Sequence, residues 1–180
     1  DWSSDVCSSD LKQLERKGTF FRCIAFVDSL RGFAGTVGTD YFPNVTDTIP
    51  LYGTNDGGKT WSPVNYKGPY VKGLCAIDIF KEQFINHGKT DYKIHIYAVG
   101  RVGSPANKMV SHDGGLSWTS YSMNNECKML FDIKMLDKNT GFVCAASDEE
   151  IEDLLQSQGF EAPKLFFSSL FWGAWITIRH

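Results

Sequence analysis

Residues 54–61 read T-N-D-G-G-K-T-W, and residues 111–118 read S-H-D-G-G-L-S-W, so one eight-residue pattern occurs twice in this chain. The tryptophans that end the two copies, Trp61 and Trp118, are 57 residues apart, and Trp175 follows after the same interval. A recurrence at this interval indicates a repeated supersecondary unit. The chain is therefore expected to contain about three copies of one such unit.

Each complete copy predicts a tight turn between two strands. An Asp followed by two glycines favours a hairpin turn, because glycine adopts positive φ without a Cβ clash. The carboxylates of Asp56 and Asp113 are expected to accept hydrogen bonds from amides of the turn, and the hydroxyls of Thr60 and Ser117 can join them. The tryptophan at the end of each copy has enough apolar area to pack one hairpin on its neighbour.

This pattern resembles the Asp-box, or BNR repeat, of sialidase-type β-propellers. The signature positions of the two copies are Asp56, Gly58, Trp61, Asp113, Gly115 and Trp118. In that family the box lies at the periphery of the blade and stabilises its turns. The resemblance therefore implies a structural role for these six residues, and no catalytic residue is assigned.

Alternating apolar residues predict three pairs of strands around the boxes. The pairs are residues 21–28 with 32–35, 74–80 with 93–100, and 130–137 with 141–144. In the first and third pairs a turn is expected at Asp28 and Asp137, followed by a strand that opens on Gly-Phe. In the middle pair the polar residues 81–91 are interpreted as a longer loop, which is where a repeated fold would carry function.

Over residues 19–169 the order of strands and boxes resembles the BNR-like propellers grouped with the photosystem II assembly factor of plants and cyanobacteria. Members are commonly seven-bladed and mostly act as binding or assembly scaffolds. The resemblance implies an all-β fold of four-stranded blades and a non-catalytic scaffold whose partner is a protein or a glycan. Because a ring needs at least four blades, residues 12–180 are expected to be a partial propeller whose remaining blades are missing.

The third box is degenerate. Ser168 and Trp175 fall on the repeat, but Leu170, Phe171 and Trp172 stand where Asp-Gly-Gly is expected. Either this blade has lost its turn chemistry or the reading frame shifts after Ser168. We favour the shift, because large apolar residues are unusual at a tight turn.

The first eleven residues, D-W-S-S-D-V-C-S-S-D-L, read as the translation of a common sequencing adapter, so residues 1–11 are interpreted as an artefact and set aside. The formal net charge of −3 includes Asp1, Asp5 and Asp10, and the remaining residues are neutral overall. Such a chain has no basic field to attract nucleic acid.

Residues 147–159 predict one short inserted helix. Ser147 and Glu150 form a capping box, and Gly159 supplies a stop. We favour a solvated loop helix over a helix that docks a partner.

Neither the cysteines nor the histidines have the spacing of a metal or redox site, so no metal or cofactor is expected. A disulfide between Cys127 and Cys144 is left open. No apolar run is long enough to span a membrane. We expect an exported protein of bacterial type, whose signal peptide would precede the residues present.

A glycoside hydrolase of sialidase or xyloglucanase type is the alternative function. Sialidases need an arginine cluster and a Tyr–Glu pair, whereas xyloglucanase-type propellers use two carboxylates. The candidates for the arginine cluster of a sialidase are Arg22, Arg31 and Arg101, and they match it poorly. The acids available near strands are Asp78, Asp91 and Asp132.

Overall fold

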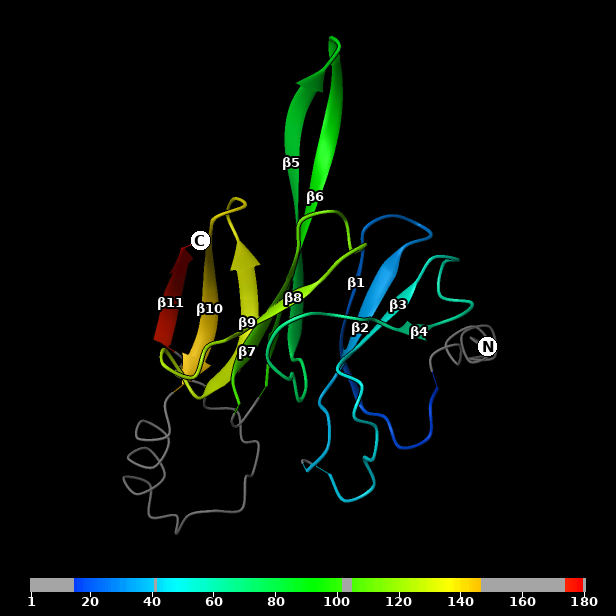
Figure 1. Cartoon of the computed structure of the whole chain (residues 1–180), viewed down its shortest axis with the longest axis vertical. Helices are drawn as coiled ribbons and strands as arrows, with labels where there is room; N and C mark the ends of the chain where they lie inside the picture. The colour runs from blue at the N-terminus through cyan, green and yellow to red at the C-terminus, as the bar shows by residue number, and fades with distance from the viewer. Residues whose placement is uncertain (1–14, 41, 102–104, 147–173, 180) are drawn as a thin grey trace, which may run out of the picture.

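The computed structural model describes residues 15–40, 42–101, 105–146 and 174–179, and this part of the chain is all-β (Figure 1). Its strands are β1 (Phe21–Phe26), β2 (Gly32–Thr36), β3 (Leu51–Thr54), β4 (Ser62–Pro63), β5 (Ala76–Asn86), β6 (Lys89–Gly100), β7 (Asn107–Ser111), β8 (Thr119–Ser122), β9 (Met129–Met135), β10 (Thr140–Ala146) and β11 (Ala174–Arg179). No helix occurs among the described residues.

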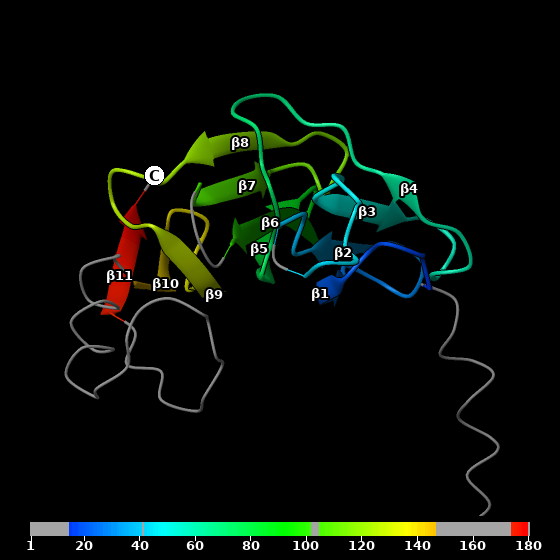
Figure 2. The same ribbon diagram turned by 90° about the horizontal axis from the view of Figure 1, so that it is seen from below.

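The strands form three separate antiparallel sheets. The first has the order β1-β2-β3-β4, the second β5-β6-β7-β8, and the third β11-β10-β9. In each sheet every strand pairs with the next one along the chain, so the strand order contains no crossover. Figure 2 shows the sheets side by side, with β1, β5 and β9 nearest one another.

The predicted strand pairs at both ends of the chain are confirmed. β1 pairs with β2 and β9 with β10, and each pair is joined by a turn built on one aspartate. Asp28 Oδ1 accepts hydrogen bonds from the amides of Leu30 and Arg31, at 2.9 and 2.8 Å. Asp137 Oδ1 does the same for residues 139 and 140, at 2.7 and 2.8 Å. Both are Asx-type turns, which the short aspartate side chain favours.

The loop interpretation of residues 81–91 is wrong. β5 continues to Asn86 and β6 begins at Lys89, so residues 81–94 form a two-stranded ribbon, and the pairing of the two strands is continuous from Ala76↔Val99 to Asn86↔Lys89. The turn is His87-Gly88, with φ of 47° and 75°, as a two-residue hairpin turn requires. Most residues of this stretch are polar, so its strands could not be recognised from the pattern of apolar residues.

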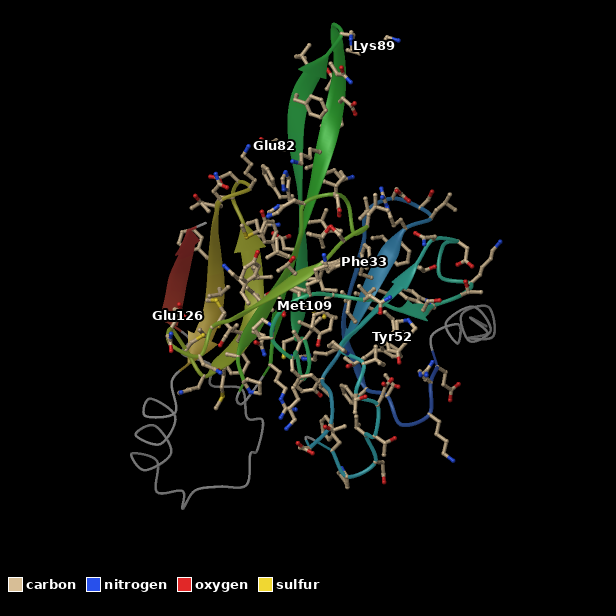
Figure 3. The ribbon with its side chains drawn as sticks, in the orientation of Figure 1. Phe33, Tyr52, Glu82, Lys89, Met109 and Glu126 are labelled. Atoms are coloured by element: carbon tan, nitrogen blue, oxygen red, sulfur yellow. The ribbon has the colours of Figure 1, made fainter. Side chains whose placement is uncertain are left out.

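Two apolar clusters hold the sheets together. Between the first and second sheets lie Val27, Phe33, Leu51, Val71, Leu74, Ile96, Ala98, Met109 and Trp118, of which Figure 3 labels Phe33 and Met109. Between the second and third sheets lie Ala76, Tyr97, Val99, Ala106, Val110, Met123, Cys127, Leu130, Ile133, Met135, Val143 and Ala145. Each sheet therefore buries its face against a neighbouring sheet, as layered all-β folds do.

The third sheet departs from the 57-residue repeat. β11 occupies the position next to β10 that β3 and β7 occupy in the other sheets, and its Trp175 pairs with Cys144 inside the strand. Trp61 and Trp118, by contrast, come directly after a turn. Ser168, residues 1–11 and the helix expected at residues 147–159 lie outside the described residues.

The four described cysteines, Cys23, Cys75, Cys127 and Cys144, are free thiols. The disulfide left open between Cys127 and Cys144 is therefore not formed in this structure.

Candidate functional site

The first box turn, residues 54–61, is closed by the side chain of Asp56. Its Oδ1 accepts the amide of Thr60 at 2.9 Å, and its Oδ2 accepts the Thr60 hydroxyl at 2.6 Å. The Thr54 hydroxyl donates to Asp56 Oδ1 at 2.8 Å and accepts the amide of Gly58 at 2.9 Å. One carboxylate and one hydroxyl thus satisfy the donors of the turn from inside.

The second box turn, residues 111–118, repeats this network. Asp113 Oδ1 accepts the amides of Leu116 and Ser117, both at 3.0 Å, and Oδ2 accepts the Ser117 hydroxyl at 2.5 Å. The Ser111 hydroxyl donates to Asp113 at 2.7 Å and accepts the amide of Gly115 at 2.8 Å. The hydrogen bonds predicted for both aspartates are present.

These bonds lower the pKa of both aspartates. The hydroxyl and then the amide of Thr60 lower the pKa of Asp56 to about 2. Partial burial alone would raise the pKa of Asp113, but the hydroxyl and amide of Ser117 outweigh it and bring the value to about 2. Both carboxylates are therefore ionised at neutral pH, as acceptors of several hydrogen bonds are.

Thr54 and Ser111 are structural residues that the sequence reasoning did not assign. Both are buried, with 2% and 1% of their surface exposed. The available signal was that both copies of the pattern begin with a hydroxyl residue, four positions before the second glycine.

The two box tryptophans differ in their surroundings. Each indole donates to the carbonyl of the second glycine, at 2.9 Å for Trp61 and 3.1 Å for Trp118. Trp118 is buried and lies edge-on to Phe33 of the first sheet, with ring centroids 5.2 Å apart. Trp61 is only half-buried and lies edge-on to Phe26 of its own sheet, at 6.1 Å. Trp118 therefore joins two sheets, whereas Trp61 covers one.

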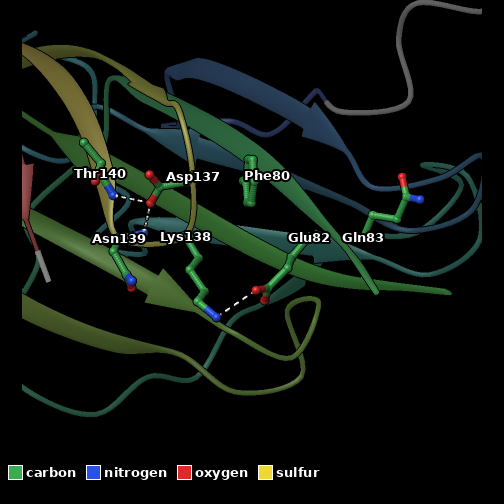
Figure 4. A pocket seen from close by; sticks show the side chains of 7 residues that line it. All are labelled: Phe80, Glu82, Gln83, Asp137, Lys138, Asn139 and Thr140. Atoms are coloured by element: carbon green, nitrogen blue, oxygen red, sulfur yellow. Dashed lines mark hydrogen bonds and ion pairs between the residues drawn. The ribbon is translucent and has the colours of Figure 1, made fainter. Parts of the chain in front are cut away.

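A pocket of about 430 Å³ lies where the base of the β5–β6 ribbon meets the β9–β10 turn (Figure 4). Its lining residues are Phe80, Glu82, Gln83, Asp137, Lys138, Asn139 and Thr140. Lys138 Nζ is 2.7 Å from Glu82 Oε1, so an ion pair joins the β9–β10 turn to β5 within the lining of the pocket.

Both carboxylates of the pocket are held in their charged form. Lys138, and after it His95, lower the pKa of Glu82, and the amide of Asn139 is the main cause that lowers the pKa of Asp137. A glycoside hydrolase requires one carboxylic acid that stays protonated near neutral pH. Neither pocket carboxylate has the environment of that acid.

A histidine pair lies beside this pocket. His95 Nε2 is 3.0 Å from Glu82 Oε2, and His95 Nδ1 is 2.7 Å from Nδ1 of His112 in the second box turn. The chain of contacts thus runs from Lys138 through Glu82 and His95 to His112. The sequence predicts no site at either histidine, because the histidines do not have metal-ligand spacing and His112 fills the free position of a box.

The acids considered for catalysis are not brought together. Asp78 accepts Lys134 Nζ at 2.9 Å and the amide of Met135 at 2.6 Å, so it links the second and third sheets. Asp91 lies exposed on the ribbon, and Asp132 lies exposed on β9.

The arginines do not cluster either. Arg22 is exposed on β1, and Arg31 precedes β2 in the Asp28 turn. Arg101 is buried beyond the other end of β2, where its guanidinium donates to the carbonyls of Val37 and Thr39 at 3.2 and 2.7 Å.

Within the described ranges, no group of three or more His, Cys, Asp or Glu side chains is placed to hold a metal ion. The same residues contain no helix with the length and apolar composition needed to cross a bilayer. No model of a known protein family matches the chain, and a search of curated proteins finds no relative.

Proposed function

We propose that this chain supplies blades of a β-propeller that acts as a binding scaffold for an extended protein segment. Three features support the propeller. The sheets are meanders that lie side by side, β1 contacts β5, and β9 contacts both β5 and β6. The second box turn packs on the preceding sheet through Trp118 and Phe33. Sheets arranged radially around their first strands are the architecture of a propeller.

The observation that carries the binding role is the ribbon, defined as residues 81–94. It continues β5 and β6 beyond the rest of the second sheet and projects from the molecule (Figure 1). β7 pairs with β6 only at residues 96–100, so in the described part of the chain the ribbon strands pair only with each other. Apart from the carbonyl of Ile94, which accepts the amide of Gly114, their outer edges offer backbone donors and acceptors to a further strand.

The ribbon also exposes apolar side chains. Phe84, Ile85 and Tyr92 have 41%, 68% and 51% of their surface exposed. A two-stranded ribbon in water has little reason to carry three such residues unless they contact something else. An added strand would pair with the backbone edge, and its alternate side chains would lie beside Ile85 and Tyr92 on one face and beside Phe84 on the other, which is the usual mode of β-augmentation.

Selection of displayed peptides on the immobilised full chain tests this function. We expect the wild-type chain to enrich β-forming peptides, and a variant with Phe84→Ser, Ile85→Ser and Tyr92→Ser to lose that enrichment while keeping the circular dichroism of the fold. Leu116→Ser is the matched control, because Leu116 is 81% exposed but lies on a box turn. Equal enrichment by the wild-type and ribbon variants would refute the proposal.

A further inference from the structure

The histidine pair at the base of the ribbon can share only one hydrogen. Glu82 is ionised and accepts, so His95 Nε2 must carry the hydrogen between them. At a separation of 2.7 Å the two Nδ1 atoms hold one hydrogen, which His112 donates and His95 accepts when both rings are neutral. One further proton can be added to this pair with the bond intact, but a second charge would place two N–H groups against each other.

We propose that Glu82, His95 and His112 form a pH-sensitive latch, which holds the second box turn on the base of the ribbon and releases it once both rings are charged. Beyond the pairing of Ser111 with Ile96, the turn also bonds β6 through the amide of Gly114, which donates to the carbonyl of Ile94 at 3.0 Å. Release of the histidine pair would weaken this attachment and loosen residues 111–118 beside the ribbon. This inference is independent of the proposed binding function.

The charges around the pair favour release in acid. Burial, then His95 and Lys93, lower the pKa of His112, and Asp113 opposes them weakly. Glu82 faces the pair from β5, Tyr97 lies with its ring centroid 5.9 Å from that of His112, and Lys138 faces Glu82 from the β9–β10 turn. Because the folded state disfavours the charged ring, the latch contributes stability above about pH 6.5 and loses it as the pH falls.

The first box turn is an internal control, because Asn55 stands where the second turn has His112. Its first glycine makes the matching bond, from the amide of Gly57 to the carbonyl of Leu30 at 2.8 Å. The pKa of both Asp56 and Asp113 is about 2, so any acid response through the aspartates is expected to be alike in the two turns. A difference between the two turns in how amide protection changes with pH would therefore come from the histidine pair.

Amide hydrogen exchange of the full chain, measured from about pH 7 to pH 4, tests the latch. The ratio of protection at residues 114–118 to protection at residues 57–61 should fall about tenfold or more as the pair becomes doubly charged. The His112→Asn variant should show a ratio that does not change with pH. A constant ratio in the wild-type chain, or the same fall in His112→Asn, would overturn the proposal.

The NMR chemical shifts of the imidazole nitrogens, followed as a function of pH, give a second measurement that does not depend on amide hydrogen exchange. The wild-type pair should take up its two protons in separate steps, as coupled groups do. In His112→Asn a single step should remain. One unsplit step for the wild-type pair would also overturn the latch.

Discussion

Gly115 of the second box turn lies against the ring of Phe33 in the first sheet, so closely that a Cβ on Gly115 would be 2.1 Å from Phe33 Cζ. The corresponding Gly58 of the first turn has no such neighbour, because its Cβ would lie 3.6 Å from the nearest atoms of Trp61. The two glycines have almost the same φ, 92° and 88°. The second glycine of the turn thus contacts a neighbouring sheet in one copy, and makes no such contact in the other.

Replacing each glycine by alanine separates the backbone strain at positive φ, which both sites share, from the contact with Phe33, which only Gly115 makes. Both variants strain the backbone at positive φ, which costs about 1 to 2 kcal/mol. Gly115→Ala should lose about 1 to 3 kcal/mol more than Gly58→Ala, because its methyl group overpacks the site beside Phe33. Urea denaturation measures the difference, and Phe33→Leu should reduce it if the clash is the cause. Equal losses in the two variants would contradict the contact.

Ser111→Ala should destabilise the fold through the amide of Gly115, which loses the acceptor of a partly buried hydrogen bond. The expected cost is about 1 to 2 kcal/mol. Ser111→Thr is the matched control, since Thr54 fills this position in the first turn. Thermal or urea unfolding should show that the threonine variant is about as stable as the wild type. If the threonine variant lost as much stability as the alanine variant, the hydroxyl would not be the stabilising group.

Acid should weaken the fold through the box aspartates. Their pKa is about 2 in the folded state and about 3.9 in an unfolded chain. Because the folded state binds fewer protons, their stabilising contribution is full above about pH 5 and is lost as the pH falls toward 2. The free energy of unfolding of an Asp56→Asn, Asp113→Asn variant should therefore depend less on pH between 5 and 2.5 than that of the wild type. Parallel curves would contradict this prediction.

Trp118→Ala should cost far more stability than Trp61→Ala. Trp118 is 3% exposed and packs between two sheets, so its removal is expected to cost about 3 to 5 kcal/mol. Trp61 is half-buried over one sheet, so less apolar contact is lost. Denaturant unfolding of the two variants gives the comparison, and similar losses would show that the inter-sheet position of Trp118 does not matter.

Local chemistry made the turns and strands predictable. Asp, Gly and a hydroxyl residue at fixed positions can satisfy a tight turn almost without help from the rest of the fold, so both box turns followed from the sequence. The strands beside Asp28 and Asp137 followed for the same reason. The ribbon did not, because Phe84 and Ile85 are consecutive and flanked by polar residues, so the stretch lacks the apolar–polar alternation of a strand.

The all-β class, the two closed turns and the strands that flank them could be predicted from the sequence, because these depend on contacts within a few residues. Tertiary structure decided which copy of the turn joins two sheets, since Trp118 meets Phe33 only when the sheets pack. It also decided the meeting of Glu82, His95 and His112, which come from two strands and a turn. Pairing across β5 and β6 and the position of the second box turn bring these three side chains together, and no spacing along the chain encodes that approach.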